Sequence, residues 1–229
     1  MARLHFRIIA FAVLFGLAFS GSAYCLSDRF ERKIDECADV LDEIMMMPEQ
    51  GIPDDLLTKA EAIGIFPTTV SGAFIFGGRF GTGVVVARDP KTRKWGAPAF
   101  YTIGGASFGF QIGGQATDIV LVITSRKGLN GLLKDSFTMG GDAAVAAGPV
   151  GRKGEVSTDL LMQASILSYS RSKGLFAGIA LQGAVVSQDK EENKALYGPG
   201  ITAYSLFSGK VPPTKEAGKL IKTLELYAP

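Results

Sequence analysis

Histidine and cysteine are almost absent from this chain of 229 residues, which has one histidine and two cysteines. The histidine, His5, and one cysteine, Cys25, lie in an apolar N-terminal segment that we expect to be removed. Only Cys37 then remains, so the processed chain can form no internal disulfide, no His-ligated metal site and no Ser-His or Cys-His catalytic pair. We therefore expect neither an enzyme, nor a metal site, nor a cofactor.

An excess of charge is also lacking once that segment is set aside. The full sequence has 24 Lys and Arg against 22 Asp and Glu. Two of the basic residues, Arg3 and Arg7, lie within residues 1–25, where no acidic residue occurs, so the remainder has no formal net charge. This balance argues against nucleic-acid binding driven by bulk positive charge.

Residues 1–25 have the pattern of a signal peptide. Arg3 and Arg7 precede an apolar run over residues 8–19, which is too short to span a bilayer comfortably, and a cleavage point after Cys25 is plausible. We expect an exported protein, periplasmic or peripherally associated with a membrane. A lipid anchor on Cys25 is the alternative, although Ser22 and Tyr24 fit an acylation motif poorly.

Residues 26–229 are long enough for one domain with a sizeable core. Apolar residues at helical spacing predict a helix over 27–47, with a strongly acidic opposite face that we interpret as solvated surface and not as a calcium site. A shorter helix is expected from Pro53 through Ala62, another over 128–137, and a last one from Pro213 through Leu226.

Glycine-rich, β-branched and aromatic segments fill the region from Val70 to Val186. Glycines inside strands usually accompany bulges or strong curvature. We therefore predict an α+β domain with a curved antiparallel sheet, barrel-like or sandwich-like, flanked by N- and C-terminal helices. The strand candidates are residues 74–76, 83–87, 97–103, 107–112, 118–124, 160–169 and 175–186.

The last two strands are joined by a loop over residues 170–174 that contains two cations, Arg171 and Lys173. Gly174 can adopt the positive φ that such a turn requires. The two cations are two residues apart, so a regular strand would point both to the same side. The two cations could bind an anion at the tip of the hairpin. The alternative is that the loop is a basic turn that only contacts solvent.

Other motifs were tested against known chemistry. The glycines of residues 77–83 match neither the dinucleotide-binding spacing nor the P-loop, because a strand follows them and Gly-Lys-Ser/Thr does not. Ser170 to Lys173 matches Ser-x-x-Lys, but the partner motifs of penicillin-binding proteins are missing. The run from Gly148 to Arg152 could direct backbone N–H groups and a guanidinium at an anion, or form only a tight turn.

Seven motifs in order resemble those of the SYLF domain over roughly residues 56–206. They begin with Lys59 to Pro67, Gly77 to Val84, Gly105 to Gly113 and Asp118-Ile-Val, and end with Ala147 to Arg152, Tyr169 to Gly178 and Asn193 to Gly198. The resemblance implies a non-enzymatic lipid-binding domain, whose eukaryotic members bind phosphoinositides and, in actin-patch proteins, actin. This chain differs by lacking an Src-homology-3 module and by having the acidic helix where some members have a basic amphipathic segment.

Together, these observations predict a protein that binds anionic phospholipid or phosphoinositide-like head groups at a membrane surface. The candidate cations are Arg171, Lys173 and Arg152, with Lys59 and Arg79 as weaker members. The alternative is a structural or envelope protein-interaction module without a lipid ligand, and an envelope protein partner is possible in either case. Actin is not expected as a partner, because export would place it out of reach unless the host is a pathogen.

Overall fold

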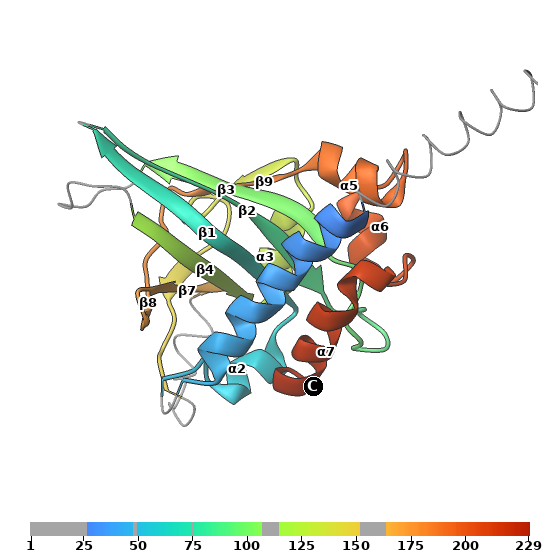
Figure 1. Cartoon of the computed structure of the whole chain (residues 1–229), viewed down its shortest axis with the longest axis horizontal. Helices are drawn as coiled ribbons and strands as arrows, with labels where there is room; N and C mark the ends of the chain where they lie inside the picture. The colour runs from blue at the N-terminus through green and yellow to red at the C-terminus, as the bar shows by residue number, and fades with distance from the viewer. Residues whose placement is uncertain (1–26, 48–49, 75, 107–114, 152–163) are drawn as a thin grey trace, which may run out of the picture.

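A curled β-sheet with helices packed on it forms the body of the protein in a computed structural model (Figure 1). The structure describes residues 27–47, 50–74, 76–106, 115–151 and 164–229. Among these residues, no helix is long and apolar enough to cross a membrane. The predicted signal peptide, the strand candidate at 107–112 and Arg152 lie outside the described residues.

Nine strands form one sheet in the order β5-β9-β3-β2-β1-β4-β7-β6, with β8 also paired to β7. All pairs are antiparallel except β6 with β7, which is parallel. The sheet curls into a half-barrel, which confirms the predicted α+β class, although it is mixed and not purely antiparallel. The strands are β1 Ala62–Phe74, β2 Phe76–Ala87, β3 Ala99–Ala106, β4 Gln115–Ile123, β5 Ser136–Thr138, β6 Val145–Ala147, β7 Ile166–Ser172, β8 Leu175–Gly178 and β9 Val185–Gln188.

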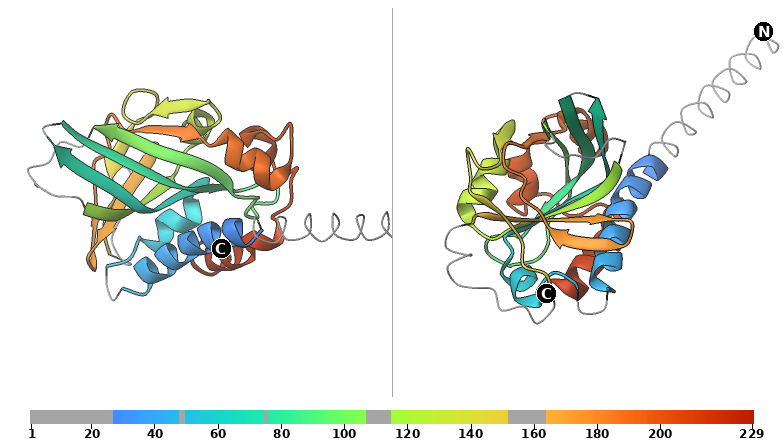
Figure 2. Two further views of the ribbon diagram at one scale, coloured as in Figure 1. Left: turned by 45° about the horizontal axis from the view of Figure 1, so that its top comes forward. Right: turned by 90° about the vertical axis from the view of Figure 1, so that its left-hand side faces the viewer.

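One face of the sheet is covered by the helix over residues 27–45, by α2 and by the C-terminal helix α7 (Figure 2, left). Short helices α3, α5 and α6 lie elsewhere around the sheet, with α5 and α6 at the end opposite the β1–β2 turn (Figure 1). The helix bounds are α2 Asp54–Lys59, α3 Arg126–Leu132, α5 Lys190–Tyr197, α6 Ala203–Phe207, the 3₁₀ turn Lys215–Ala217 and α7 Gly218–Tyr227.

Strand alternation divides the apolar core into two clusters, one on each face of the sheet. In β1, Ile63 and Ile65 pack toward the helices, whereas Ala62 and Phe66 pack into the cluster on the concave side. The helix-side cluster includes Phe30, Ile34 and Leu41 of the N-terminal helix and Leu220 and Leu224 of α7. The predicted apolar stripes of both terminal helices are therefore confirmed.

The acidic face of the N-terminal helix is solvated only in part. The Asp39 carboxylate pairs with the Lys219 ammonium at 2.5 Å, and the Tyr227 hydroxyl donates to Asp42 at 2.7 Å. Glu43 pairs with Arg171. Three of these carboxylates thus hold the helix against other elements, which the helical periodicity alone could not indicate.

Several predicted boundaries were wrong. The second helix ends at Lys59 and Ala62 already belongs to β1, because Ala62 pairs with Ala87 on one side and with Ile123 on the other. The helix predicted over 128–137 ends at Leu132, because Ser136 and Phe137 belong to β5 and pair with β9.

Two strand candidates were also divided differently. The candidate at 74–76 contains the end of β1 and the start of β2, and the strand predicted over 175–186 is split into β8, which pairs with β7, and β9, which pairs with β3 and β5. In these places the pairing across the sheet overrides the local pattern.

The glycines of β2 serve close packing of the sheet. A Cβ at Gly83 would collide with the carbonyl oxygen of Ile65, and one at Gly81 would collide with the side chain of Thr69. Both partners belong to the irregular part of β1, where the register shifts between Ile65 and Val70. The glycines therefore accommodate a β-bulge. This role is consistent with the conclusion from the sequence that residues 77–83 do not form a phosphate-binding loop.

Candidate functional site

The turn between β7 and β8 is shorter than predicted. Lys173 and Gly174 alone connect the strands, and both have positive φ, 49° and 78°. Two such residues are typical of the type I′ turn, which matches the twist of a hairpin. The positive φ expected for Gly174 is confirmed. The strand β7 ends at Ser172, so Lys173 lies in the turn and the alternation of side chains along a strand no longer applies to it. The prediction that Arg171 and Lys173 point to the same side therefore does not follow from the strand.

Arg171 is tied into the fold and is not an exposed cation of the tip. Its Nη2 and Nε donate to Oδ2 of Asp118 at 2.7 and 3.0 Å, and its Nη1 donates to Glu43. The backbone N–H of Thr68 donates to the other Asp118 oxygen at 2.9 Å. The cluster joins the N-terminal helix, β1, β4 and β7. The expectation of an exposed Arg171 was wrong, because two carboxylates from distant parts of the chain converge on it.

Partial burial lowers the pKa of the Arg171 guanidinium, which remains protonated at neutral pH. With two carboxylates bound, the group has little charge left to offer an external anion. The contact of Arg171 with a head group stays a prediction. In the structure its guanidinium links β7 to β4 and to the N-terminal helix.

Lys173 and Leu175 lie at the tip of this hairpin and point into solvent. Lys173 is exposed and forms no ion pair with any residue that the structure describes. Leu175 is 76% exposed. The β7–β8 turn therefore presents one free cation and one apolar side chain.

The β1–β2 hairpin presents a second pair of exposed apolar side chains. Val70 and Phe80 are direct cross-strand partners, and they are 54% and 60% exposed. The neighbouring Arg79 is half-buried and has no hydrogen-bond or ion-pair partner among the described residues. Burial lowers the pKa of its guanidinium. Because side chains alternate along a strand, Arg79 points to the opposite face of β2 from Phe80, so this hairpin presents an apolar pair on one face and a cation on the other.

Both hairpins end on the same side of the sheet. Val70 is paired with Ala116 of β4, and Asp118, two residues further along β4, is paired with Arg171 of β7. The β1–β2 and β7–β8 turns accordingly lie at one end of the sheet, away from α5 and α6 (Figure 1). We call Val70, Arg79, Phe80, Lys173 and Leu175 the hairpin end. The sequence singled out Arg79 and Lys173, but not the three apolar residues, whose exposure no local pattern indicated.

The remaining predicted cations are not part of the hairpin end. Lys59 closes α2, where its ammonium lies 3.8 Å from the Asp55 carboxylate, and the chain enters β1 from there at the strand end opposite the hairpin turn. Arg152 is outside the described residues. Gly148, predicted to direct N–H groups at an anion, packs instead against the ring of Tyr169, with no room for a Cβ.

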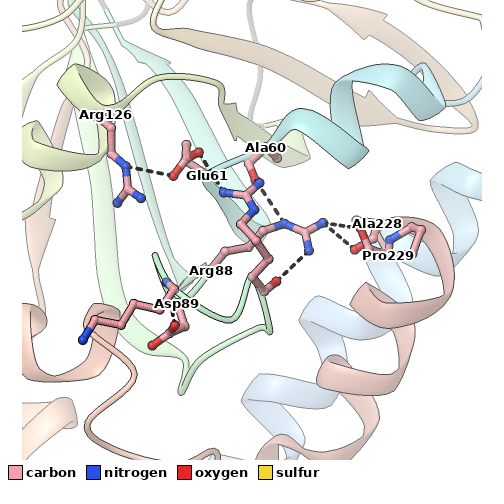
Figure 3. A network of polar contacts seen from close by, with 9 residues as sticks. Ala60, Glu61, Arg88, Asp89, Arg126, Ala228 and Pro229 are labelled. Carbon is pink, nitrogen blue, oxygen red and sulfur yellow. Dashed lines mark hydrogen bonds and ion pairs between the residues drawn. The ribbon is translucent and has the colours of Figure 1, made fainter.

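The basic turn over residues 88–94 is engaged in the fold (Figure 3). The buried Arg88 donates to the carbonyl oxygens of Ala60 at 3.1 Å and Ala228 at 2.6 Å, and its guanidinium lies 4.1 Å from the centre of the Trp95 ring. Arg93 pairs with Glu61 at 2.8 Å. Arg88 fastens the C-terminal helix to the sheet, whereas Lys91 and Lys94 of the same turn are exposed and form no ion pair with another described residue.

The described residues contain no group of three His, Cys, Asp or Glu side chains that could hold a metal ion. Cys37 is fully buried, and burial raises the pKa of its thiol far above neutrality. A thiol in that state is a poor nucleophile. Cys37 is therefore not a candidate nucleophile.

Comparison with known proteins identifies the family. Residues 104–227 match the model of the Ysc84 family, described as "Las17-binding protein actin regulator". An SH3 domain-containing protein of Schizosaccharomyces pombe is 38% identical over 180 residues, which are 77% of this chain and 41% of that protein. LAS seventeen-binding protein 3 of Saccharomyces cerevisiae is 34% identical over 79% of this chain and 39% of that protein.

The human SH3 domain-containing YSC84-like protein 1 is likewise 34% identical, over 79% of this chain and 52% of its own length. The chain thus spans about half or less of the relatives that it matches. Their names describe binding proteins and regulators, not enzymes. Because the family model matches more than half of the chain, the chain belongs to the Ysc84 family, whose domain is the SYLF domain.

Proposed function

We propose that this protein binds anionic membrane surfaces through the hairpin end, without catalysing a reaction. The observation that supports the proposal is that three exposed apolar side chains, Val70, Phe80 and Leu175, lie at the same end of the sheet as Arg79 and Lys173, two cations without a carboxylate partner among the described residues. Peripheral membrane proteins use this combination, because apolar side chains enter the acyl boundary while cations contact anionic head groups.

The expected affinity is modest. Each cation near an anionic bilayer contributes on the order of 1 kcal/mol. Partial burial of each exposed apolar side chain adds roughly 1 kcal/mol. The costs of association offset much of this sum, so a single chain should bind reversibly and the affinity should fall with salt. Glu36 of the acidic N-terminal helix lies across a groove from Val70 and Phe80, and its repulsion by the same membrane lowers the affinity further.

Vesicle sedimentation tests this proposal. The purified chain is mixed with vesicles of phosphatidylglycerol and phosphatidylcholine, or of phosphatidylcholine alone, at low and high salt. We expect binding to the anionic vesicles only, weakened roughly tenfold or more by Lys173→Glu combined with Leu175→Ser. A matched control, Lys210→Glu with Tyr204→Ser, changes the same residue classes on α6 and the loop after it, and should leave binding unchanged.

Equal binding by the two double variants would refute the hairpin end as the contact. Failure of the parent chain to bind any anionic vesicle would refute lipid binding altogether. The structural or envelope protein-interaction module would then be the better interpretation.

A second candidate function is binding of a protein partner of the actin-regulating machinery. The family description and the name of the yeast relative, which both refer to binding Las17, favour it. Cosedimentation with actin filaments, and capture assays with purified Las17, would test it directly. If the variant with Lys173→Glu and Leu175→Ser binds the protein partner as strongly as the parent chain does, the partner contacts another part of the domain.

A further inference from the structure

A groove separates the N-terminal helix from the helix-side face of β1, β2 and β3. Its volume is about 260 Å³. Phe80, Val84 and Phe100 provide its apolar lining, and Thr82, Glu36 and Asp189 are among its polar groups. The volume is below the roughly 300–1,000 Å³ of typical small-molecule pockets. A groove of this size suits a single bulky apolar side chain, such as the anchor residue of a protein partner.

The rim of the groove has more carboxylates than cations. Lys33 also lines it, and its ammonium lies 3.1 Å from Glu192, which also pairs with Arg29 at 2.8 Å. Glu36, Asp189 and Glu192 therefore outnumber Lys33 and Arg29 by one charge. Glu36 is exposed and forms no ion pair with another described residue. Asp189 accepts the backbone N–H of Glu192 at 3.1 Å and caps α5, and its carboxylate also borders the groove. A ligand with a positive charge beside its apolar part would complement this rim.

We infer that the groove docks a segment of a partner protein in which a bulky apolar side chain lies next to lysine or arginine. The apolar side chain enters between Thr82 and Phe100, and the cation pairs with Glu36. An anionic membrane is disfavoured at the side of the groove formed by Glu36 and Asp189, whose carboxylates would repel it, whereas Val70 and Phe80 lie on the hairpin side. The groove shares Val70 and Phe80 with the hairpin end, so both are left unchanged in the test. The inference itself does not depend on the membrane contact proposed above.

The probe is a fluorescein-labelled peptide with one phenylalanine between pairs of lysines, and its binding to the purified chain is followed by fluorescence anisotropy. A second peptide has serine in place of phenylalanine. We expect the serine peptide to bind about tenfold more weakly, since it buries no aromatic side chain. Glu36→Lys should weaken the phenylalanine peptide about tenfold by replacing attraction with repulsion. Glu31→Lys, an equal charge change on the same helix outside the groove, should have less than a twofold effect.

Thr82→Trp, at an exposed strand position, should fill the groove and abolish peptide binding while leaving vesicle binding intact. Thermal melting shows whether this variant folds, and Glu36→Lys carries the test if it does not. Equal effects of Glu31→Lys and Glu36→Lys, equal binding of the two peptides, or no binding of either would overturn the inference. Loss of vesicle binding in Glu36→Lys or in a folded Thr82→Trp variant would assign the groove to the membrane instead. Loss of vesicle binding in the hairpin-end variant alone would show that the membrane contact and the peptide-binding groove can be altered separately.

Discussion

Arg171 and Asp118 are direct cross-strand partners on β7 and β4, and one carboxylate oxygen accepts both Nη2 and Nε of the guanidinium, at 2.7 and 3.0 Å. Both side chains are largely withdrawn from water, with 18% and 16% of their surface exposed. The hairpin that carries Lys173 is thereby held to β4 by Arg171, two residues before its tip.

Arg171→Ala should lower the free energy of unfolding by about 1–3 kcal/mol, because it leaves the Asp118 and Glu43 carboxylates without their cation. Lys173→Ala should change it by less than about 0.5 kcal/mol. Urea unfolding of the two variants provides the comparison. Equal stabilities would show that the cluster contributes nothing and that Arg171 is available to a ligand.

Gly83→Ala should destabilise the sheet by about 2 kcal/mol or more, since the added methyl would overlap the Ile65 carbonyl across the bulge. Gly78→Ala on the same strand is the matched control, because no atom lies within 4 Å of the position its Cβ would take. Melting temperatures of the two variants would differ by several degrees if the close approach is real. A Gly83→Ala protein as stable as the control would contradict the packing described for β1 and β2.

Arg88→Met should loosen the C-terminal helix, because the carbonyl oxygens of Ala60 and Arg93 lose a buried donor and that of Ala228 retains only Trp95. We expect a loss of about 3 kcal/mol, together with faster amide exchange in α7 than in β1. Lys91→Ala in the same exposed turn should alter neither quantity. Uniform acceleration of exchange across the sheet would mean that the contact supports the whole fold and not this helix alone.

Acid should weaken the fold through two turn carboxylates. Hydrogen bonds from the backbone N–H groups of Thr92 and Lys91 lower the pKa of Asp89, and the hydrogen bond from Lys134 does the same for Asp142. A carboxyl whose folded pKa is depressed stabilises the fold above its unfolded pKa of about 4 and loses that contribution as pH falls through the lower folded value.

Replacing both residues by asparagine should therefore flatten the decline of unfolding free energy below about pH 4. Urea unfolding at a series of pH values measures the slope, and Glu191→Gln with Asp54→Asn is the matched pair of charge removals. The same slope in both double variants would show that Asp89 and Asp142 are not responsible.

Export is expected from the basic and apolar pattern of residues 1–25. Expression of the full sequence in a bacterium should yield a periplasmic form whose N-terminus lies near Leu26, as determined by N-terminal sequencing. Intact mass distinguishes the alternatives, because a diacylglycerol-sized increment on Cys25 would identify a lipoprotein. Retention of residues 1–25 in the cytoplasm would refute the signal-peptide interpretation.

Sequence alone determined the features that depend on neighbouring residues. Apolar spacing located the helix over 27–45 and α7, and the polar run over residues 170–174 located the β7–β8 turn, although the turn itself is only Lys173 and Gly174. The glycine-rich strands indicated a curved sheet, and motifs in register indicated the family. In each case the deciding interaction lies within a few positions along the chain, where periodicity and turn preferences act.

Only the tertiary structure decided how the polar groups pair and which apolar groups remain exposed. Arg171 meets Asp118 and Glu43 across 53 and 128 positions of sequence, and Arg88 meets Ala228 across 140. No local pattern reports such partners, so the sequence could not distinguish a free cation from a paired one. The sequence could not predict the exposure of Val70 and Phe80 for the same reason. A side chain is buried only if a distant element covers it, and none of the described elements fully covers these two.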